Sequence, residues 1–158
     1  MLHSKAPIVY VVRDGRDVMV SLYSNKKYFR GEPVDEFDHF LNNYSREWSA
    51  HISACLAKKE LIIARYEELL LCPERVLKNI FNQLKVAVED TVTAEAINLF
   101  SFEKLSKRIK GNEDVHSFFR KGIAGDWKNY FNNQHKALFK SIAGELLITL
   151  GYEKDGTW

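Results

Sequence analysis

The run Pro7-Ile-Val-Tyr-Val-Val12 decides the fold class of this chain. It is short, unbroken and apolar, and most of its side chains are β-branched. It lacks the alternation of apolar and polar residues that marks a half-exposed strand, so the pattern predicts a strand buried on both faces. Such strands are typical of the parallel sheets of α/β proteins.

A polar turn follows this strand and leads into a helix. The turn reads Arg13-Asp-Gly-Arg-Asp17, and an amphipathic helix is predicted to begin near Asp17. Arg13 then lies just past the carboxyl end of a parallel strand, where open α/β sheets bind their ligands, and Ser21 lies one turn into the helix. The two residues form a candidate ligand site. Equally, an arginine after a strand is often only a surface charge, and a serine within a helix often has no function.

The rest of the chain supplies a second strand and several helices. Apolar residues at helical spacing predict a long helix over 35–57, and residues 61–66 form a second apolar strand that ends at Tyr66. Further helices are predicted from Pro73, around 94–100, from residue 101 and over 134–150, with a polar loop over 106–116. Since no linker or repeat divides the chain, we expect one α/β domain over residues 1–158, mostly helical with a small parallel sheet.

The composition is that of an ordinary soluble globular protein, and it limits the possible partners. Of the 158 residues, 46% are hydrophobic and 28% are charged. The net charge of +2 creates no overall field that would attract nucleic acid or a membrane surface, so any anion site must be local. Two isolated cysteines, scattered histidines and the lack of a long apolar run predict no disulfide, no metal site and no membrane segment. We expect a cytoplasmic protein.

A second candidate anion site lies near the end of the chain. Two adjacent cations, Arg120 and Lys121, precede Gly122, and another glycine follows at Gly125. Glycines let the backbone turn its N–H groups towards an anion, while arginine grips a phosphate through two parallel hydrogen bonds. Taken alone, this short motif also fits a solvated basic turn.

Together, these features make the chain resemble the sulfotransferases that use 3′-phosphoadenosine 5′-phosphosulfate. The resemblance covers roughly residues 8–151 and rests on motifs that occur in the order of the family. They are Arg13 with Asp17 and Ser21, the strand-ending Tyr66-Glu67-Glu68, Ser101-Phe102, and Arg120-Lys121-Gly122-x-x-Gly125-Asp126-Trp127-Lys128.

The resemblance implies a P-loop-NTPase-like sulfotransferase fold and a role for each motif. In that family, the matching residues hold the 3′-phosphate of the nucleotide: Arg13, Ser21, Arg120, Lys121 and Gly122. The aromatic residues that match Tyr66 and Phe102 lie against the adenine, which stacks well on an aromatic face. The implied cosubstrate is 3′-phosphoadenosine 5′-phosphosulfate, and the implied product is adenosine 3′,5′-bisphosphate.

Two positions depart from the family pattern. Phe100 stands where the family usually has a threonine, which removes one hydrogen bond near the adenine. The dimerisation motif that begins at Lys128 continues with Thr-Val and then Glu in the family, whereas this chain has Asn132, Asn133 and Ala137. These substitutions argue against that mode of dimerisation.

The part of the family fold that grips the 5′-phosphosulfate has no counterpart in this sequence. No Gly-Lys-Ser or Gly-Lys-Thr occurs, and His3 does not match the histidine motif that supplies the base in the family. We therefore assign no catalytic residue and expect a sulfotransferase fold that lacks its N-terminal part. Because a first strand without neighbours bares an edge, we expect self-association, a partner that supplies the missing half, or a rearranged helix over the edge.

The leading hypothesis is a partial sulfotransferase that transfers a sulfonate to a hydroxyl or amine of a small-molecule or carbohydrate acceptor. The alternative from another class is a non-catalytic module that binds adenosine 3′,5′-bisphosphate. A third possibility is a retained core that binds no ligand. None of these residues specifies the acceptor.

Overall fold

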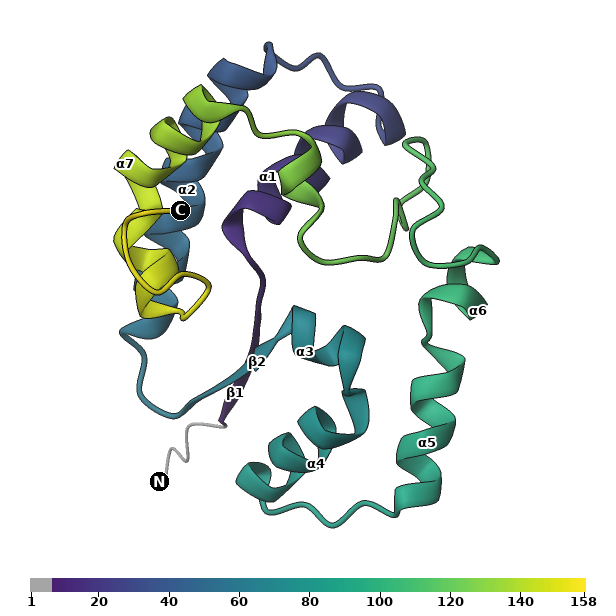
Figure 1. The fold of residues 1–158 in the computed structure, drawn as a ribbon. Coiled ribbons are helices and arrows are strands. Elements are labelled where there is room, and N and C mark those ends of the chain that lie inside the picture. The colour runs from purple at the N-terminus through teal and green to yellow at the C-terminus, as the bar shows by residue number, and fades with distance from the viewer. Residues whose placement is uncertain (1–6) are drawn as a thin grey trace. The chain divides into compact units, whose positions relative to one another are not determined.

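The two predicted strands pair in parallel in the computed structural model, which describes residues 7–158 (Figure 1). β1 spans Ile8–Val12 and β2 spans Leu61–Arg65, aligned from their first to their last residues. Tyr66, predicted to end the second strand, instead begins helix α3. Most of the other elements are helices, so the predicted α/β class with a small parallel sheet is confirmed.

β1 is less buried than its sequence predicts. Val12 is buried, but Ile8 is 43% exposed, Val9 40% and Val11 50%. The sheet formed by residues 7–158 has only two strands, and burial on both faces needs covering layers that such a sheet lacks. The prediction of a strand buried on both faces is therefore wrong for the described chain. Within residues 7–158, β1 pairs with β2 alone.

The described residues group into two compact units, each built from two segments of the chain. The first unit contains residues 7–13 and 58–110, and the second contains residues 14–57 and 111–158. The expectation of one domain over residues 1–158 stays a prediction. None of the helices in the described part of the chain is both long enough and apolar enough to cross a bilayer.

The first unit packs helices against the sheet. α3 spans Tyr66–Leu71, and α4 spans Pro73–Leu84 with its proline in the first turn, where no N–H donor is needed. The core between β2 and α4 consists of four buried apolar residues: Ile62, Ala64, Val76 and Ile80. α5 spans Asp90–Leu99, so it begins four residues before the predicted start, and α6 spans Phe102–Ser106.

The second unit is built on three helices. α1 spans Gly15–Ser24 and continues as the π-helix η1, Asn25–Phe29. α2 spans Phe37–Leu56 and packs against both α1 and α7, which spans Asn133–Thr149. The buried side chains of α2 include Phe40, Leu41, Trp48 and Ile52 of the predicted apolar stripe. In α7 the buried face is shifted from the predicted one: Phe139 is buried as predicted, but the helix otherwise buries Ala143, Gly144 and Leu147, whereas the predicted Leu138, Ile142 and Leu146 are only partly buried.

Gly15, at the start of α1, allows side chains of α2 and α7 to pack directly against the backbone of α1. A Cβ atom at this position would lie 2.7 Å from the Phe139 ring and 2.8 Å from the Trp48 ring. Both rings are buried and packed against each other, with their centroids 5.9 Å apart, so neither can move aside easily. Any side chain at position 15 would therefore displace α2 or α7.

Arg16 forms a charged centre inside the second unit. Its side chain is only 2% exposed, and its guanidinium carbon lies 3.9 Å from the centroid of the Trp127 ring and 4.4 Å from that of the Trp158 ring. Its nitrogens bind the carboxylates of Asp14 at 2.7 Å and Glu153 at 2.5 Å. This contact ties the start of α1 to the end of the chain, a link that the sequence does not predict.

Candidate functional site

The seven residues predicted to bind the nucleotide divide between the two units. Arg13, Tyr66 and Phe102 belong to the first unit, and Ser21, Arg120, Lys121 and Gly122 belong to the second. The single pocket that we expect for both groups stays a prediction.

Arg13 and Tyr66 come together in the first unit. Because β1 and β2 are parallel, both strands end at the same edge of the sheet, which places Arg13 and Tyr66 directly after their carboxyl ends. The Arg13 guanidinium carbon lies 4.6 Å from the centroid of the Tyr66 ring, within the range of a cation–π contact. Among the described residues, the buried Arg13 Nε has no hydrogen-bond partner, so this arginine keeps a donor for another group.

Phe102 begins α6 directly after a helix cap. The Ser101 hydroxyl accepts a hydrogen bond from the Lys104 N–H, which fixes the start of this helix. The Phe102 ring is partly buried, and the Arg108 guanidinium carbon lies 5.7 Å from its centroid. Phe100, which replaces the family threonine, is 73% exposed.

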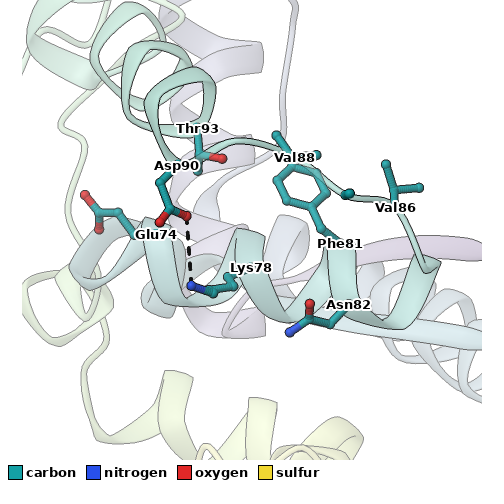
Figure 2. Close-up of a pocket in the computed structure, with 9 residues that line it drawn as sticks. Glu74, Lys78, Phe81, Asn82, Val86, Val88, Asp90 and Thr93 are labelled. Atoms are coloured by element: carbon teal, nitrogen blue, oxygen red, sulfur yellow. Dashed lines mark ion pairs between the residues drawn. The ribbon is translucent and has the colours of Figure 1, made fainter.

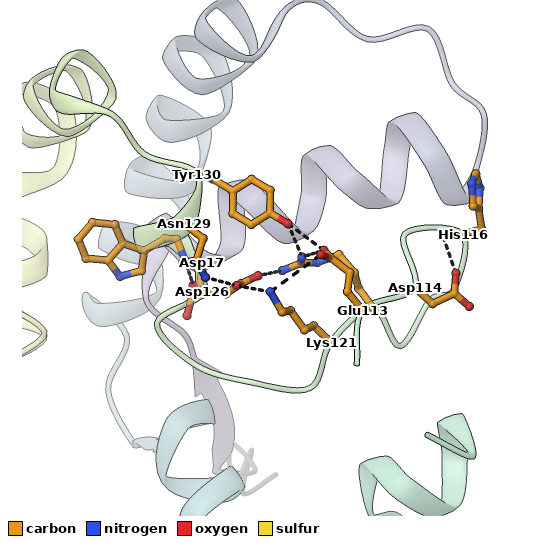
Figure 3. A network of polar contacts seen from close by, with 10 residues as sticks. Asp17, Glu113, Asp114, His116, Lys121, Asp126, Asn129 and Tyr130 are labelled. Atoms are coloured by element: carbon orange, nitrogen blue, oxygen red, sulfur yellow. Dashed lines mark hydrogen bonds and ion pairs between the residues drawn. The ribbon is translucent and has the colours of Figure 1, made fainter. Parts of the chain in front are cut away.

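Arg120 and Lys121 converge on one buried carboxylate in the second unit (Figure 3). Arg120 Nη2 lies 2.6 Å from Asp126 Oδ2, and Lys121 Nζ lies 2.7 Å from Asp126 Oδ1. The Asp126 side chain is completely buried and also accepts a hydrogen bond of 2.9 Å from the Asn129 amide. Asp126 therefore positions both cations.

A second carboxylate contacts the same two cations from the preceding loop. Glu113 forms an ion pair with Arg120 and lies 3.9 Å from Lys121 Nζ, while the Tyr130 hydroxyl donates to it at 2.9 Å (Figure 3). Backbone hydrogen bonds of 2.9 Å from the N–H groups of Gly111 and Asp114 hold this loop beside residues 120–121. The Glu113 side chain therefore forms part of the cation site.

Asp17 joins helix α1 to the loop that carries the two cations. Its carboxylate accepts hydrogen bonds from the backbone N–H groups of Gly125, at 2.6 Å, and Trp127, at 2.8 Å. The residue is 1% exposed, and its partners lie more than a hundred positions later in the chain. Ser21 lies one helical turn after Asp17, so the same contact fixes the helix that carries Ser21 relative to this loop.

The two glycines of the loop have the backbone conformation that glycine favours. Gly122 has φ +67° and Gly125 has φ +78°, both in the left-handed region where a Cβ atom is strained. A Cβ atom at Gly125 would meet no other atom within 4 Å, so the requirement there is conformational. Gly125 also ends the loop by leading into the 3₁₀ helix η2, Asp126–Asn129.

Burial and charge act in opposite directions on the ionisable groups of this cluster. Burial alone would raise the pKa of Asp126, but the hydrogen bonds that it accepts outweigh burial and hold its pKa below the ordinary value of 3.8. Burial would lower the pKa of Arg120, but its carboxylate partners raise it instead. The pKa of Tyr130 is raised, mainly by burial and to a smaller extent by the hydrogen bond to Glu113. At neutral pH the cluster therefore holds a fully charged Arg120–Asp126 pair.

The lowered pKa of Asp126 predicts acid sensitivity. Above pH 3.8 the carboxylate is ionised in both the folded and the unfolded chain, so its stabilising contribution is complete. As the pH falls below this value, the unfolded chain binds the proton first, and the contribution is lost once the pH passes the lower folded-state pKa. Urea unfolding between pH 7 and pH 2 should show the stability difference between wild type and Asp126→Asn narrowing as the pH falls. A difference that does not depend on pH would contradict this assignment.

One hollow of the first unit contains none of the predicted residues (Figure 2). It has a volume of about 440 Å³ and lies between α4, the connection that follows it and the start of α5. The Lys78 and Asp90 side chains approach to 3.9 Å at its rim. His3, the one histidine considered as a base, lies outside the described residues.

Comparisons with known proteins agree with these motifs. A family model described as "Sulfotransferase domain" matches residues 1–151. Sulfotransferase 1B1 of the dog, Canis lupus familiaris, is 29% identical over 155 residues, which cover 85% of this chain and 52% of that protein. Flavonol 3-sulfotransferase of Flaveria bidentis is 32% identical over 178 residues, which cover 94% of this chain and 57% of that protein. The chain thus spans about half the length of the curated relatives it matches.

Solved structures share the fold of this chain. A crystal structure of mouse sulfotransferase SULT7A1 complexed with PAP matches with a TM-score of 0.73 at 24% identity, covering 89% of this chain and 58% of that chain. A crystal structure of retinol dehydratase with androsterone and the inactive cofactor PAP matches with a TM-score of 0.72 at 21% identity, covering 89% and 47%. Since the family model covers residues 1–151 of 158, this chain belongs to the sulfotransferase family.

Proposed function

We propose that this chain is the nucleotide-binding part of a sulfotransferase. Its cosubstrate is 3′-phosphoadenosine 5′-phosphosulfate, and the complete enzyme transfers the sulfonate to a hydroxyl or amine of a small-molecule or carbohydrate acceptor. The observation that carries this proposal is the Asp17 contact, which holds the helix bearing Ser21 against the loop bearing Arg120 and Lys121 within one unit.

In this proposal, a 3′-phosphate is bound by two cations, a hydroxyl and backbone N–H groups of the second unit. Arg120 supplies a planar fork, Lys121 a point charge, Ser21 a hydroxyl and the turn at Gly122 its N–H group. Arg13 adds a second fork, for which its unpartnered Nε is suited. Tyr66 and Phe102 supply aromatic faces for the adenine, a contact worth about 1–3 kcal/mol for each stacked base.

The reacting end of the cosubstrate needs further groups. Transfer of a sulfonate requires positive charge at the oxygens where negative charge develops, and a base that accepts the proton of the acceptor. We assign neither role to a residue of this chain. The proposed contribution of residues 7–158 is therefore to bind and orient the nucleotide.

Calorimetric titration with two nucleotides tests the binding proposal. Adenosine 3′,5′-bisphosphate should bind at least tenfold more tightly than adenosine 5′-monophosphate, because a hydrogen bond to a charged group contributes about 1.5–3 kcal/mol. Arg13→Ala and Arg120→Lys should each remove most of this difference, since lysine keeps the charge but not the fork. Arg30→Ala is the matched control, because Arg30 is exposed and pairs only weakly with Glu32 at 3.2 Å.

The outcome also separates the alternative functions. Equal affinities for the two nucleotides would exclude both nucleotide-binding functions and leave only the third possibility, a retained core that binds no ligand. A preference for the bisphosphate fits both an enzyme and a non-catalytic binding module. Transfer of radiolabelled sulfonate to a panel of alcohols and amines, with the full-length protein, then distinguishes these two, because a module produces no labelled acceptor.

The exposure of β1 supports the proposal that the chain associates with a second copy or with a partner. Among the described residues β1 pairs only with β2, and three of its apolar side chains are exposed, which is a surface that invites pairing with another strand. Light scattering at high protein concentration should reveal species larger than the monomer. A single sharp monomer peak would contradict this proposal.

Both cysteines carry free thiols, in keeping with the cytoplasmic location that we propose.

A further inference from the structure

Glu113 occupies the place where the proposed site would bind an anion. Its carboxylate contacts Arg120 and Lys121 and accepts a hydrogen bond from the Tyr130 hydroxyl at 2.9 Å. These are the two cations that the proposed function assigns to the 3′-phosphate. A bound phosphate and the Glu113 carboxylate would therefore compete for the same donors.

The two carboxylates of this cluster differ in how firmly they are held. Asp126 is completely buried and binds both cations at 2.6–2.7 Å, so it belongs to the framework of the loop. The Glu113 side chain is 29% exposed; it pairs closely with Arg120 but lies 3.9 Å from Lys121, on a loop that backbone hydrogen bonds join to residues 120–121. Glu113 is therefore the carboxylate that can leave while the loop stays folded.

The charges of these four groups show what Glu113 changes. Arg120 and Lys121 carry two positive charges, and Asp126 and Glu113 carry two negative charges, so the cluster is neutral. When Glu113 withdraws, one positive charge remains for an incoming anion. A phosphate brings nearly two negative charges and three acceptor oxygens, whereas a carboxylate brings one charge and two oxygens. A phosphate can therefore displace Glu113 where a weaker anion cannot.

We infer that Glu113 is a specificity-determining residue that acts as a built-in competitor of the 3′-phosphate. This inference rests on the proposed function and deepens it. Glu113 lowers the affinity of the Arg120–Lys121 pair for every anion, so that only a strongly charged phosphate remains bound. It also keeps the cluster neutral when no nucleotide is present.

The experiment compares Glu113→Gln with wild type in calorimetric titrations of the full chain. Glutamine keeps the size of the side chain and its hydrogen bond to Tyr130 but removes the charge. The affinity for adenosine 3′,5′-bisphosphate should rise about tenfold, a modest gain because the ion pair is partly exposed and screened by water. The affinity for adenosine 5′-monophosphate should rise much less, because this nucleotide lacks the 3′-phosphate that the proposed site places at the two cations. A merely structural role for Glu113 could not produce tighter binding, since destabilisation only weakens it.

Asp114→Asn provides the matched control. Its carboxylate is adjacent in sequence and accepts a hydrogen bond from the His116 N–H at 3.0 Å, on the side of the loop away from the two cations (Figure 3). This variant should bind both nucleotides as wild type does. Circular dichroism should show that both variants are folded.

A titration with inorganic phosphate separates this inference from the proposed function. Tighter binding of phosphate by Glu113→Gln, with no binding of the bisphosphate by either protein, would overturn the nucleotide proposal and support the role of Glu113. Bisphosphate binding by wild type that does not improve in Glu113→Gln would support the nucleotide proposal and overturn the role of Glu113. If neither anion binds either protein, both the nucleotide proposal and the role of Glu113 are overturned.

Discussion

Replacing Arg16 by alanine is expected to lower the free energy of unfolding by about 3–5 kcal/mol, the usual cost of removing one partner from a buried ion pair. The carboxylates of Asp14 and Glu153 would lose the cation that both bind. A cavity would also open where the Arg16 guanidinium now packs against the Trp127 and Trp158 rings. The midpoint of thermal unfolding should fall by about 6–20 °C, since 1 kcal/mol corresponds to about 2–4 °C in a chain of this size.

Near-ultraviolet circular dichroism reports this change directly, because both tryptophan rings lie against the Arg16 guanidinium. Their signal should weaken in Arg16→Ala even at temperatures where the helices persist. Arg30→Ala is again the control, since its ion pair with Glu32 is exposed and contributes at most about 1 kcal/mol. Equal stabilities of the two variants would show that Arg16 is not a structural centre.

Replacing Asp17 by alanine is expected to have the second-largest effect. The N–H groups of Gly125 and Trp127 would lose their acceptor, and a buried donor left without a partner costs about 1–3 kcal/mol. The loop that carries Arg120 and Lys121 would then detach locally from α1. We therefore expect both a stability loss of about 3 kcal/mol and the loss of the preference for adenosine 3′,5′-bisphosphate.

Amide hydrogen exchange measures the loop contact by itself. In Asp17→Ala, the amides of Gly125 and Trp127 should exchange at least tenfold faster than in wild type, because they lose the acceptor that protects them. Asp17→Asn keeps one acceptor oxygen and should show an intermediate effect. Asp90→Ala, which removes an exposed carboxylate at the start of α5, should leave both amides protected. Unchanged protection in Asp17→Ala would disprove the proposed link.

Several features of the protein follow from local sequence alone. Apolar runs locate both strands, since a strand of β-branched residues has no competing helical pattern. Helical spacing locates much of the buried face of α2, and Pro73 marks the start of α4. For α7 it locates Phe139 but not the buried Ala143, Gly144 and Leu147, because the face that α7 buries depends on how it packs against α2. The glycines at 122 and 125 are required by their backbone conformation, which depends mainly on the residue itself. The order of the short motifs likewise indicates the family.

Other features depend on contacts between distant parts of the chain, and no local pattern contains them. Arg13 and Arg16 belong to the same polar turn, yet Arg16 is buried because two tryptophans from the last third of the chain enclose it. The burial of a strand face likewise depends on what covers it, so β1 has an apolar sequence and an exposed surface. Glu113 reaches the cations only because backbone hydrogen bonds bring its loop beside them. A charge takes its role from the groups that surround it, and those groups come together only when the chain folds.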